Sequence, residues 1–459
     1  MNKYDAIIIG SGIGGLATAL MLSHQGRKIL LIEKNKFLGG RLSSFKRDGF
    51  NVDLGVHVIS RSDKGPIGEV LRRVGIANPI SYTTVRPLSS YHGKTFIFPR
   101  DLKEMTTESD FNALMNILKD INMMSEDQVK SYDDVDLKTF LLSYTQDPLI
   151  HACFCNISTI YVCLPTWLAS AGEFMRCLRM EAQARSSGYP EGGCAVITNT
   201  YADGIKRFGG EIISGVRVDK IEVEGGRVTG VVVGDQVYKA DVVISNGDIR
   251  STVLTLVGSE YFPKDYVDYI QSLKYSWSGP VVRVALDKKV TDIKMLTQFG
   301  TTDQEGYYEK MANGVMPDEL NLFIVIPTNF SPSVGPEGKQ LVCIASPMPL
   351  ATPKAILEQM TEGMIETARK YIPNLRDDAL WTNTMTVDQL EKMVGESGAG
   401  IGIGQRPGQC GDKRPGIKTP LEGLYIVGAE AGGIGVGTEL AVNSAMEFID
   451  KYSPLSRHI

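Results

Sequence analysis

The sequence predicts an α/β fold, because short apolar segments alternate with helical segments at both ends of the chain. Residues 4–9 and 28–32 are apolar and have the length of strands, and the alanine-containing segment 16–24 between them is typical of a helix. Near the C-terminus, an apolar segment at 423–428 precedes a glycine-rich stretch and a further helical segment. Strands that are apolar on both faces indicate a parallel sheet with helices on either side.

The composition excludes several classes of protein. The chain has 459 residues, enough for two or three domains, and 43% of them are hydrophobic and 22% charged, as in an ordinary globular protein. Its formal net charge of −5 leaves no basic excess, so we expect no nucleic-acid partner. The uncharged segment 6–22 holds four glycines, which is atypical of a spanning helix, so any membrane contact should be peripheral.

The seven cysteines are odd in number and show no paired spacing typical of a zinc site. We expect buried thiols in a reducing compartment, which favours a cytoplasmic protein. Cys153 and Cys155 are separated by one residue, and a redox or metal role for this pair is the alternative. No H-E-x-x-H or Ser-His-Asp arrangement is visible, and we predict no metal site.

The turn Gly10-Ser-Gly12-Ile-Gly-Gly15 follows the first apolar segment and opens the first helical one. Gly10 permits the tight turn, Gly12 lets the backbone approach a pyrophosphate, and Gly15 lets the helix pack closely on the strand. The helix N-terminus then offers free N–H groups and a positive dipole end to phosphate oxygens. Strand, turn, helix and second strand together predict a Rossmann-like dinucleotide-binding unit.

Glu33 ends the second strand, where the ribose of an adenosine is expected. A carboxylate there accepts hydrogen bonds from ribose hydroxyls and repels a 2′-phosphate. The residue therefore favours FAD or NAD over NADP.

Two further glycine-containing segments, Gly39-Gly40-Arg41 and Gly49-Phe-Asn-Val-Asp53-Leu-Gly55-Val-His57, follow the acid. With them the chain resembles the flavin-dependent amine oxidase and phytoene desaturase superfamily, in its phytoene dehydrogenase-related branch. The resemblance implies that Arg41 reaches the FAD pyrophosphate beside Gly40, for which a guanidinium fork is suited. It also implies that Gly55 and His57 lie near the isoalloxazine. His57 is our candidate proton relay, although a purely structural histidine is the more common case.

The same resemblance extends through the middle and end of the chain. Residues 189–193 are similar to the family's Y-P-x-G-G segment, and the valine that matches Val218 contacts the adenine through its backbone. At the C-terminus, the resemblance implies that Gly428, Glu430 and Gly437 surround the ribitol, phosphate and ring of the flavin. The helix that begins near residue 438 would direct its positive end at the flavin N1 and O2 edge.

The resemblance also implies a discontinuous Rossmann-like FAD-binding domain, with an inserted α+β substrate domain. We assign residues 1–99, 186–256 and 396–459 to the FAD-binding domain, and 100–185 and 257–395 to the substrate domain. The apolar segment 139–181 within the latter is expected to be core, or alternatively to line a hydrophobic tunnel or a membrane-facing mouth.

These observations predict an FAD-dependent oxidoreductase that acts on CH–CH bonds of a hydrophobic, isoprenoid-like or alicyclic substrate. A hydride would move between the substrate and flavin N5, in either direction, with oxygen, a quinone or a protein as the electron partner. The segment 404–424 has no aromatic residue, which lowers the expectation of an amine oxidase. A flavin amine or protoporphyrinogen oxidase and a redox-neutral isomerase remain the alternatives. A second dinucleotide fingerprint is missing, so NAD(P)H is not an obvious partner.

Overall fold

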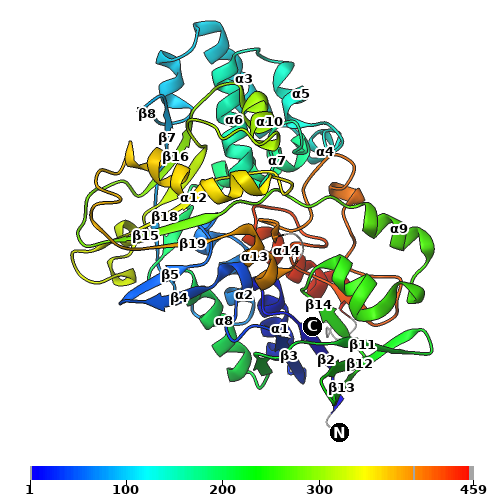
Figure 1. The fold of residues 1–459 in the computed structure, drawn as a ribbon. Coiled ribbons are helices and arrows are strands. Elements are labelled where there is room, and N and C mark those ends of the chain that lie inside the picture. The colour runs from blue at the N-terminus through cyan, green and yellow to red at the C-terminus, as the bar shows by residue number, and fades with distance from the viewer. Residues whose placement is uncertain (1–2, 396–397, 454–459) are drawn as a thin grey trace.

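The computed structural model describes residues 3–395 and 398–453, and it confirms a mixed α/β fold. A five-stranded parallel sheet lies at the bottom of Figure 1, a seven-stranded sheet lies above it, and a group of helices forms a cap at the top. The predicted domain limit at 396 and the outermost residues 1–2 and 454–459 fall outside this description.

The five-stranded sheet brings the two ends of the chain together. Its strands run parallel, and β14 lies between β2 from the start of the chain and β20 from its end. In sheet order they are β10 (Glu211–Ser214), β3 (Ile29–Glu33), β2 (Ala6–Ile9), β14 (Val243–Ser245) and β20 (Leu424–Ile426). The side chains of β2, β3, β14 and β20 are buried, which explains why these four segments lack a polar face.

Helix α1 (Ile13–His24) packs between α14 (Thr438–Glu447) and α8 (Ala195–Arg207). Eleven of its residues are buried, which matches its uniformly apolar sequence. Helix α2 (Pro66–Arg73) packs beside α14. A separate four-stranded sheet has the order β1 (Lys3–Tyr4), β13 (Gln236–Ala240), β12 (Arg227–Val233) and β11 (Lys220–Glu224).

The seven-stranded sheet is antiparallel except between β16 and β7, which run parallel. Its order is β19 (Ala379–Met385), β15 (Val281–Leu286), β18 (Gln340–Ala345), β17 (Leu322–Val325), β16 (Met295–Phe299), β7 (Leu88–Tyr91) and β8 (Lys94–Phe96). Strands β7 and β8 lie within the range 1–99 that the sequence assigned to the FAD-binding domain. A division by sheets would therefore assign β7 and β8 to the substrate domain. The polar sequence of this hairpin gave no sign of pairing with β16, a buried strand more than 200 positions away.

The helical cap consists of α3 (Glu108–Met123), α4 (Glu126–Lys130), α5 (Leu137–Leu142), α6 (Pro148–Tyr161) and α7 (Ala171–Ala184). Each begins after a Ser, Thr or Asp side chain that accepts a hydrogen bond from a backbone N–H of the first turn. Apolar side chains of 139–181 belong to the buried cluster of this cap, including Phe154 and Phe174, and to a second buried cluster, including Leu164 and Cys177. The core interpretation of this segment therefore holds for most of its length.

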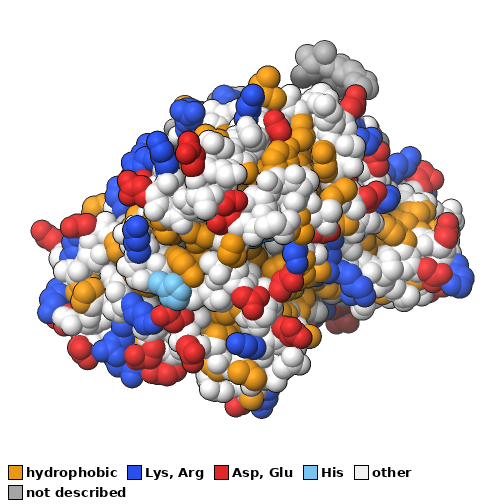
Figure 2. Space-filling model, turned by 90° about the horizontal axis from the view of Figure 1, so that it is seen from above, with side chains coloured by type: hydrophobic (Ala, Val, Ile, Leu, Met, Phe, Trp, Pro, Cys, Tyr) orange, Lys and Arg blue, Asp and Glu red, His pale blue; other side chains and the backbone are white. Residues whose placement is uncertain are grey.

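The remaining elements connect these layers. They are α9 (Lys264–Ser272), α10 (Gln304–Ala312), α11 (Pro327–Phe330), α12 (Lys354–Arg369), α13 (Val387–Val394), and the ribbons β4 (Ser44–Arg47) with β5 (Phe50–Asp53) and β6 (Tyr82–Thr84) with β9 (Gly188–Pro190). Within the described ranges, no helix combines the length and the apolar composition needed to cross a bilayer. On the face shown in Figure 2, acidic and basic side chains are interspersed, without a large patch of one sign.

Candidate cofactor site and adjoining cavity

The turn between β2 and α1 has the backbone geometry expected of a phosphate-binding loop. Gly10 adopts φ +94°, which only glycine tolerates readily, and Gly12 precedes the helix with no side chain capping its free N–H groups. A Cβ on Gly15 would collide with the carbonyl oxygen of Gly10. Gly12 also forms an isolated parallel bridge with Gly39, and Gly40 lies next to it. The predicted glycines are thus brought together around one uncapped helix N-terminus, which fits a dinucleotide pyrophosphate.

Asn246, which directly follows β14, occupies the centre of this region. A Cβ added to Gly12 would lie 2.6 Å from the side-chain Nδ2 of Asn246, and a Cβ added to Gly14 would lie 2.7 Å from its Oδ1. Asn246 also lies against Gly428 at the end of β20. The sequence placed this residue only at the end of a strand. Its position at the carboxyl edge of a central parallel strand was the available signal, because ligands of such sheets bind there.

Glu33 is 5% exposed and accepts four hydrogen bonds. Ser11 donates its N–H at 2.8 Å and its hydroxyl at 2.7 Å to Oε2, and Asn35 donates its N–H and its side-chain amide to Oε1, both at 2.8 Å. These bonds fix the carboxylate at the end of β3. Since a carboxylate has about four acceptor positions, ribose hydroxyls would have to replace some of these donors.

Val218 lies between β10 and β11 with its side chain buried. Within the described part of the chain, neither its N–H nor its carbonyl oxygen forms a hydrogen bond. Backbone groups left open in this way suit recognition of an adenine edge.

Arg41 points toward the C-terminal half of the chain. Its Nε and Nη2 donate to the carbonyl oxygen of Ala399 at 3.1 and 2.7 Å. Burial lowers the pKa of its guanidinium, and the negative charge of Glu430 opposes this shift. Arg41 and Glu430 come from opposite ends of the sequence, and their charges interact in the folded protein.

The C-terminal segment forms a glycine-rich loop between β20 and α14. Gly428 has φ +93° and Gly437, just before α14, has φ +39°. Arg414 donates to the carbonyl oxygens of Ala429 at 2.5 Å and Gly432 at 2.8 Å, which holds the loop in place. Glu430 is 7% exposed and faces Gly402, where a Cβ would collide with it.

Asp53 and Arg283 connect this region to the seven-stranded sheet. Asp53 accepts hydrogen bonds from the Tyr189 hydroxyl at 2.5 Å and the Cys194 N–H at 3.0 Å. Arg283, on β15 and 1% exposed, donates to the carbonyl oxygens of Asp53, at 2.7 Å, and of Leu54. It therefore fixes the backbone that leads into Gly55 and His57. Arg283 was missed by the sequence analysis, although an arginine in the middle of a strongly apolar strand was a usable signal.

A cavity of about 180 Å³ lies between this loop, helix α6 and the seven-stranded sheet. Arg41, Gly55 and His57 form one wall, and apolar side chains dominate the rest. Those apolar residues are Leu54, Val56, Ile160, Trp277, Val281, Leu322, Phe323, Ala345, Pro347, Met385, Leu390 and Met393. The polar members besides Arg41 and His57 are Asn156, Thr159, Cys163, Ser278 and Ser346. Within the described residues, no Asp or Glu lines it.

His57 packs its ring against the backbone of Gly55, where a Cβ would collide with it. Its Nδ1 is buried and has no hydrogen-bond partner among the described residues. Burial lowers the pKa of the imidazole, although Asp53 opposes this effect, and the lowered pKa favours the neutral ring. A neutral imidazole with an open ring nitrogen is able to accept a proton.

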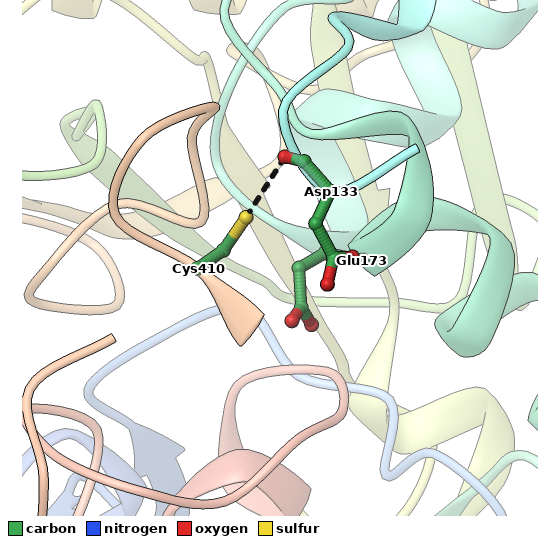
Figure 3. A group of neighbouring side chains, drawn as sticks. All are labelled: Asp133, Glu173 and Cys410. Atoms are coloured by element: carbon green, nitrogen blue, oxygen red, sulfur yellow. Dashed lines mark hydrogen bonds between the residues drawn. The ribbon is translucent and has the colours of Figure 1, made fainter. Parts of the chain in front are cut away.

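A separate group of side chains, Asp133, Glu173 and Cys410, lies close enough together to hold a metal ion (Figure 3). Arg176 already pairs with both carboxylates, at 2.7 Å to Asp133 and 3.2 Å to Glu173. The Cys410 thiol donates to the backbone oxygen of Asp133 at 3.1 Å, and burial raises its pKa to about 12. Since the metal-binding form is the thiolate, we interpret this group as a structural ion-pair cluster.

The parallel sheet and the uncapped glycine turn are features of a Rossmann-like dinucleotide-binding fold. Residues 13–447 match the family described as flavin containing amine oxidoreductase. The chain belongs to this family, which confirms the recognition made from the motifs and implies a flavin cofactor.

Similar proteins agree with this assignment. The chain is 24% identical to 4,4'-diapolycopen-4-al dehydrogenase of Metabacillus indicus over 96% of both chains. It is 23% identical to the zeta-carotene-forming phytoene desaturase of Myxococcus xanthus, over 92% of this chain and 89% of that one. Among solved structures, an oxidoreductase from Methanosarcina mazei shares the fold with a TM-score of 0.78 at 22% identity, covering 97% of this chain and 100% of that one. Putrescine oxidase bound to putrescine gives a TM-score of 0.69 at 15% identity, covering 97% of both chains. The roles of individual residues stay predictions.

Proposed function

We propose that this protein is an FAD-dependent oxidoreductase that forms or removes a carbon–carbon double bond in a hydrophobic, uncharged substrate. The observation that carries the proposal is the cavity beside Gly55 and His57, whose wall is largely apolar and contains no carboxylate among the described residues. The relatives named for phytoene and for diapolycopenal support the same class of substrate.

The residues that would hold FAD are those gathered around the two chain ends. The N-terminus of α1 and the glycines Gly12 and Gly40 would bind the pyrophosphate, with Arg41 beside them. Glu33 would bind the adenosine ribose, and the backbone of Val218 the adenine. FAD, when bound, supplies the two-electron acceptor or donor for the reaction.

The side chains of the cavity would position the substrate and exclude water from it. Removal of hydride from one carbon requires loss of a proton from its neighbour, and His57 Nδ1 is the proposed acceptor of that proton. Burial lowers the pKa of His57, which favours the neutral form that this role requires. The protein then needs an external electron partner, for which oxygen, a quinone or another protein are the candidate classes.

The cavity argues against an amine oxidase acting on a charged amine. Burying an ammonium group among apolar side chains is costly unless a carboxylate compensates it. Arg41 is the charged group of the cavity wall and has the wrong sign. A redox-neutral isomerase would use the same cavity, and net electron transfer is what separates the two activities.

The test is to purify the protein with FAD and mix it anaerobically with a polyene hydrocarbon, an amine and a porphyrinogen in separate cuvettes. We expect two electrons to be exchanged with the hydrocarbon alone: either the oxidised flavin absorbance disappears and the product has one more double bond, or chemically reduced flavin is reoxidised and the product has one fewer. Loss of the oxidised flavin absorbance with the amine or the porphyrinogen, and not with the hydrocarbon, would contradict the proposal. Isomerisation that occurs solely after chemical reduction of the flavin, without net electron transfer, would also contradict it.

A further inference from the structure

A buried ion pair lies at the N-terminus of α14, outside the cavity. Arg61 donates from Nε to Oε1 of Glu439 at 2.5 Å, and Glu439, the second residue of α14, is 1% exposed. The two residues are 378 positions apart in the sequence. The pair joins the N-terminal segment after β5 to the C-terminal helix.

Arg61 is held by its backbone as well as by its side chain. It adopts φ +52°, and the following residue, Ser62, adopts φ +46°. Its carbonyl accepts a hydrogen bond from the Ser186 hydroxyl at 3.0 Å, and its N–H donates to the Ser187 hydroxyl at 3.3 Å. Two consecutive left-handed residues that are not glycine are costly, and such strain concentrates at functional sites.

Among the described residues, only one of the two carboxylate oxygens of Glu439 has a hydrogen-bond donor. Its Oε2 is buried and forms no hydrogen bond within the described residues. It faces the glycine-rich loop, because a Cβ on Gly435 would lie 3.2 Å from it. A structural ion pair is expected to satisfy both carboxylate oxygens, as Arg176 does for Asp133.

We propose that Arg61 and Glu439 are positioning residues that set the electrostatic potential which α14 presents to the flavin. This inference rests on the proposed function and on the expectation from the sequence that the N-terminus of α14 faces the edge of the flavin ring. An uncompensated helix N-terminus carries a partial positive charge of about half a unit. The full negative charge of Glu439 opposes that field, and the positive charge of Arg61 restores it.

The sign of the effect follows from the charge that each substitution leaves behind. Reduced flavin is stabilised by nearby positive charge, so its reduction potential rises with such charge and falls with negative charge. Glu439→Gln leaves Arg61 positive and should raise the potential. Arg61→Gln leaves Glu439 negative and should lower it. In the double variant both charges are gone, and the potential should return close to that of the unchanged protein.

The experiment measures the midpoint potential of bound FAD by equilibrium reduction against a reference dye at pH 8.5. Arg61→Lys is the matched control, because it keeps the charge and should stay close to the unchanged protein. Thermal unfolding of the FAD-free variants reports whether each one folds, and FAD titration reports whether each one binds. If Arg61→Gln does not fold, Glu439→Gln against Arg61→Lys still carries the test.

The outcomes separate this inference from the proposed function. Opposite shifts in the two single variants, cancelling in the double variant, support it. FAD-loaded variants that all share one potential overturn it and leave the proposed function standing. If the unchanged protein binds no FAD at all, the proposed function itself is overturned.

Discussion

The turn before α1 and the cavity below the seven-stranded sheet are built in different ways. The turn depends on the backbone, since Gly10 and Gly12 form a tight loop within a few residues of one another. The cavity depends on side chains that come from the loop at 54–57, helix α6, four strands of the sheet and α13. We infer that a site formed by the glycines of one turn is insensitive to substitutions elsewhere in the chain but is disrupted by an added side-chain atom. A cavity lined by side chains from several elements, by contrast, accommodates substitutions in its wall.

The strongest test of this contrast places one methyl group at two positions of the turn. Gly15→Ala puts a Cβ against the carbonyl oxygen of Gly10, and neither backbone segment is free to move. We expect the loss of the cooperative unfolding transition, because overpacking against a rigid backbone exceeds the usual cost of about 1–3 kcal/mol. Thermal unfolding of the FAD-free protein measures this.

Gly12→Ala is the matched control for that experiment. Its Cβ would meet the amide of Asn246, which is the end of a rotatable side chain, and Gly12 has a negative φ of −54°. We therefore expect a folded protein with weakened FAD binding. Equal unfolding behaviour of the two variants would contradict the close-packing role assigned to Gly15.

The sequence predicted the turn well for a physical reason. A glycine at a fixed spacing constrains the local backbone, so Gly10, Gly12 and Gly15 reveal their geometry without knowledge of distant contacts. Glu33 was equally accessible, because the end of a buried strand is defined by the same short segment.

The connections between distant segments could not be predicted in this way. Arg283 lies 230 positions from Asp53, and nothing near it in sequence indicates which carbonyl oxygens it contacts. The pairing of β7 with β16 and the ion pair of Arg61 with Glu439 are of the same kind. A sequence pattern identifies a residue that needs a partner, but the fold selects the partner.

Arg283→Met should have the next largest effect, and it tests how the assembled region is anchored. The substitution removes the donors to the carbonyl oxygens of Asp53 and Leu54 and to Asn383 Oδ1. Each buried acceptor left without a donor costs about 1–3 kcal/mol, so we expect a loss of about 4 kcal/mol in the free energy of unfolding. Urea denaturation measures it.

Arg283→Lys keeps the charge without the planar fork of the guanidinium. Its free energy of unfolding should lie between those of Arg283→Met and the unchanged protein. Arg227→Met, at an exposed position of β12, should leave stability unchanged within about 0.5 kcal/mol. A loss at Arg227 as large as that at Arg283 would refute the anchoring role.

Glu181 offers a smaller effect that depends on pH. Burial, together with the charge of Glu439, raises its pKa from 4.5 to about 7, although hydrogen bonding from Ser187 opposes this. Between these values the folded protein holds a proton that the unfolded chain has released, so stability falls as the pH rises through this window. The fall should reach about 3 kcal/mol at most and level off above pH 7.

Glu181→Gln should remove this component of the pH dependence. We expect the variant to gain stability relative to the unchanged protein from pH 4.5 to 7, measured by urea denaturation at each pH. Glu104→Gln, at an exposed position, is the control and should run parallel to the unchanged protein. A constant difference between Glu181→Gln and the unchanged protein at every pH would contradict the assignment.

The mildest substitution tests whether the cavity is as adjustable as the comparison implies. Ala345→Leu adds apolar volume to its wall at the end of β18, far from the glycine turn in sequence. Since neighbouring side chains are able to shift, we expect a cost of about 1.4 kcal/mol in binding of a hydrophobic substrate, or about tenfold. FAD affinity should stay unchanged, because the residues proposed to bind the pyrophosphate and the adenosine come from other segments of the chain. Ala355→Leu, on the exposed face of α12, should change neither quantity. A loss of FAD binding in Ala345→Leu would show that the two regions are not separable, and the contrast between them would fail.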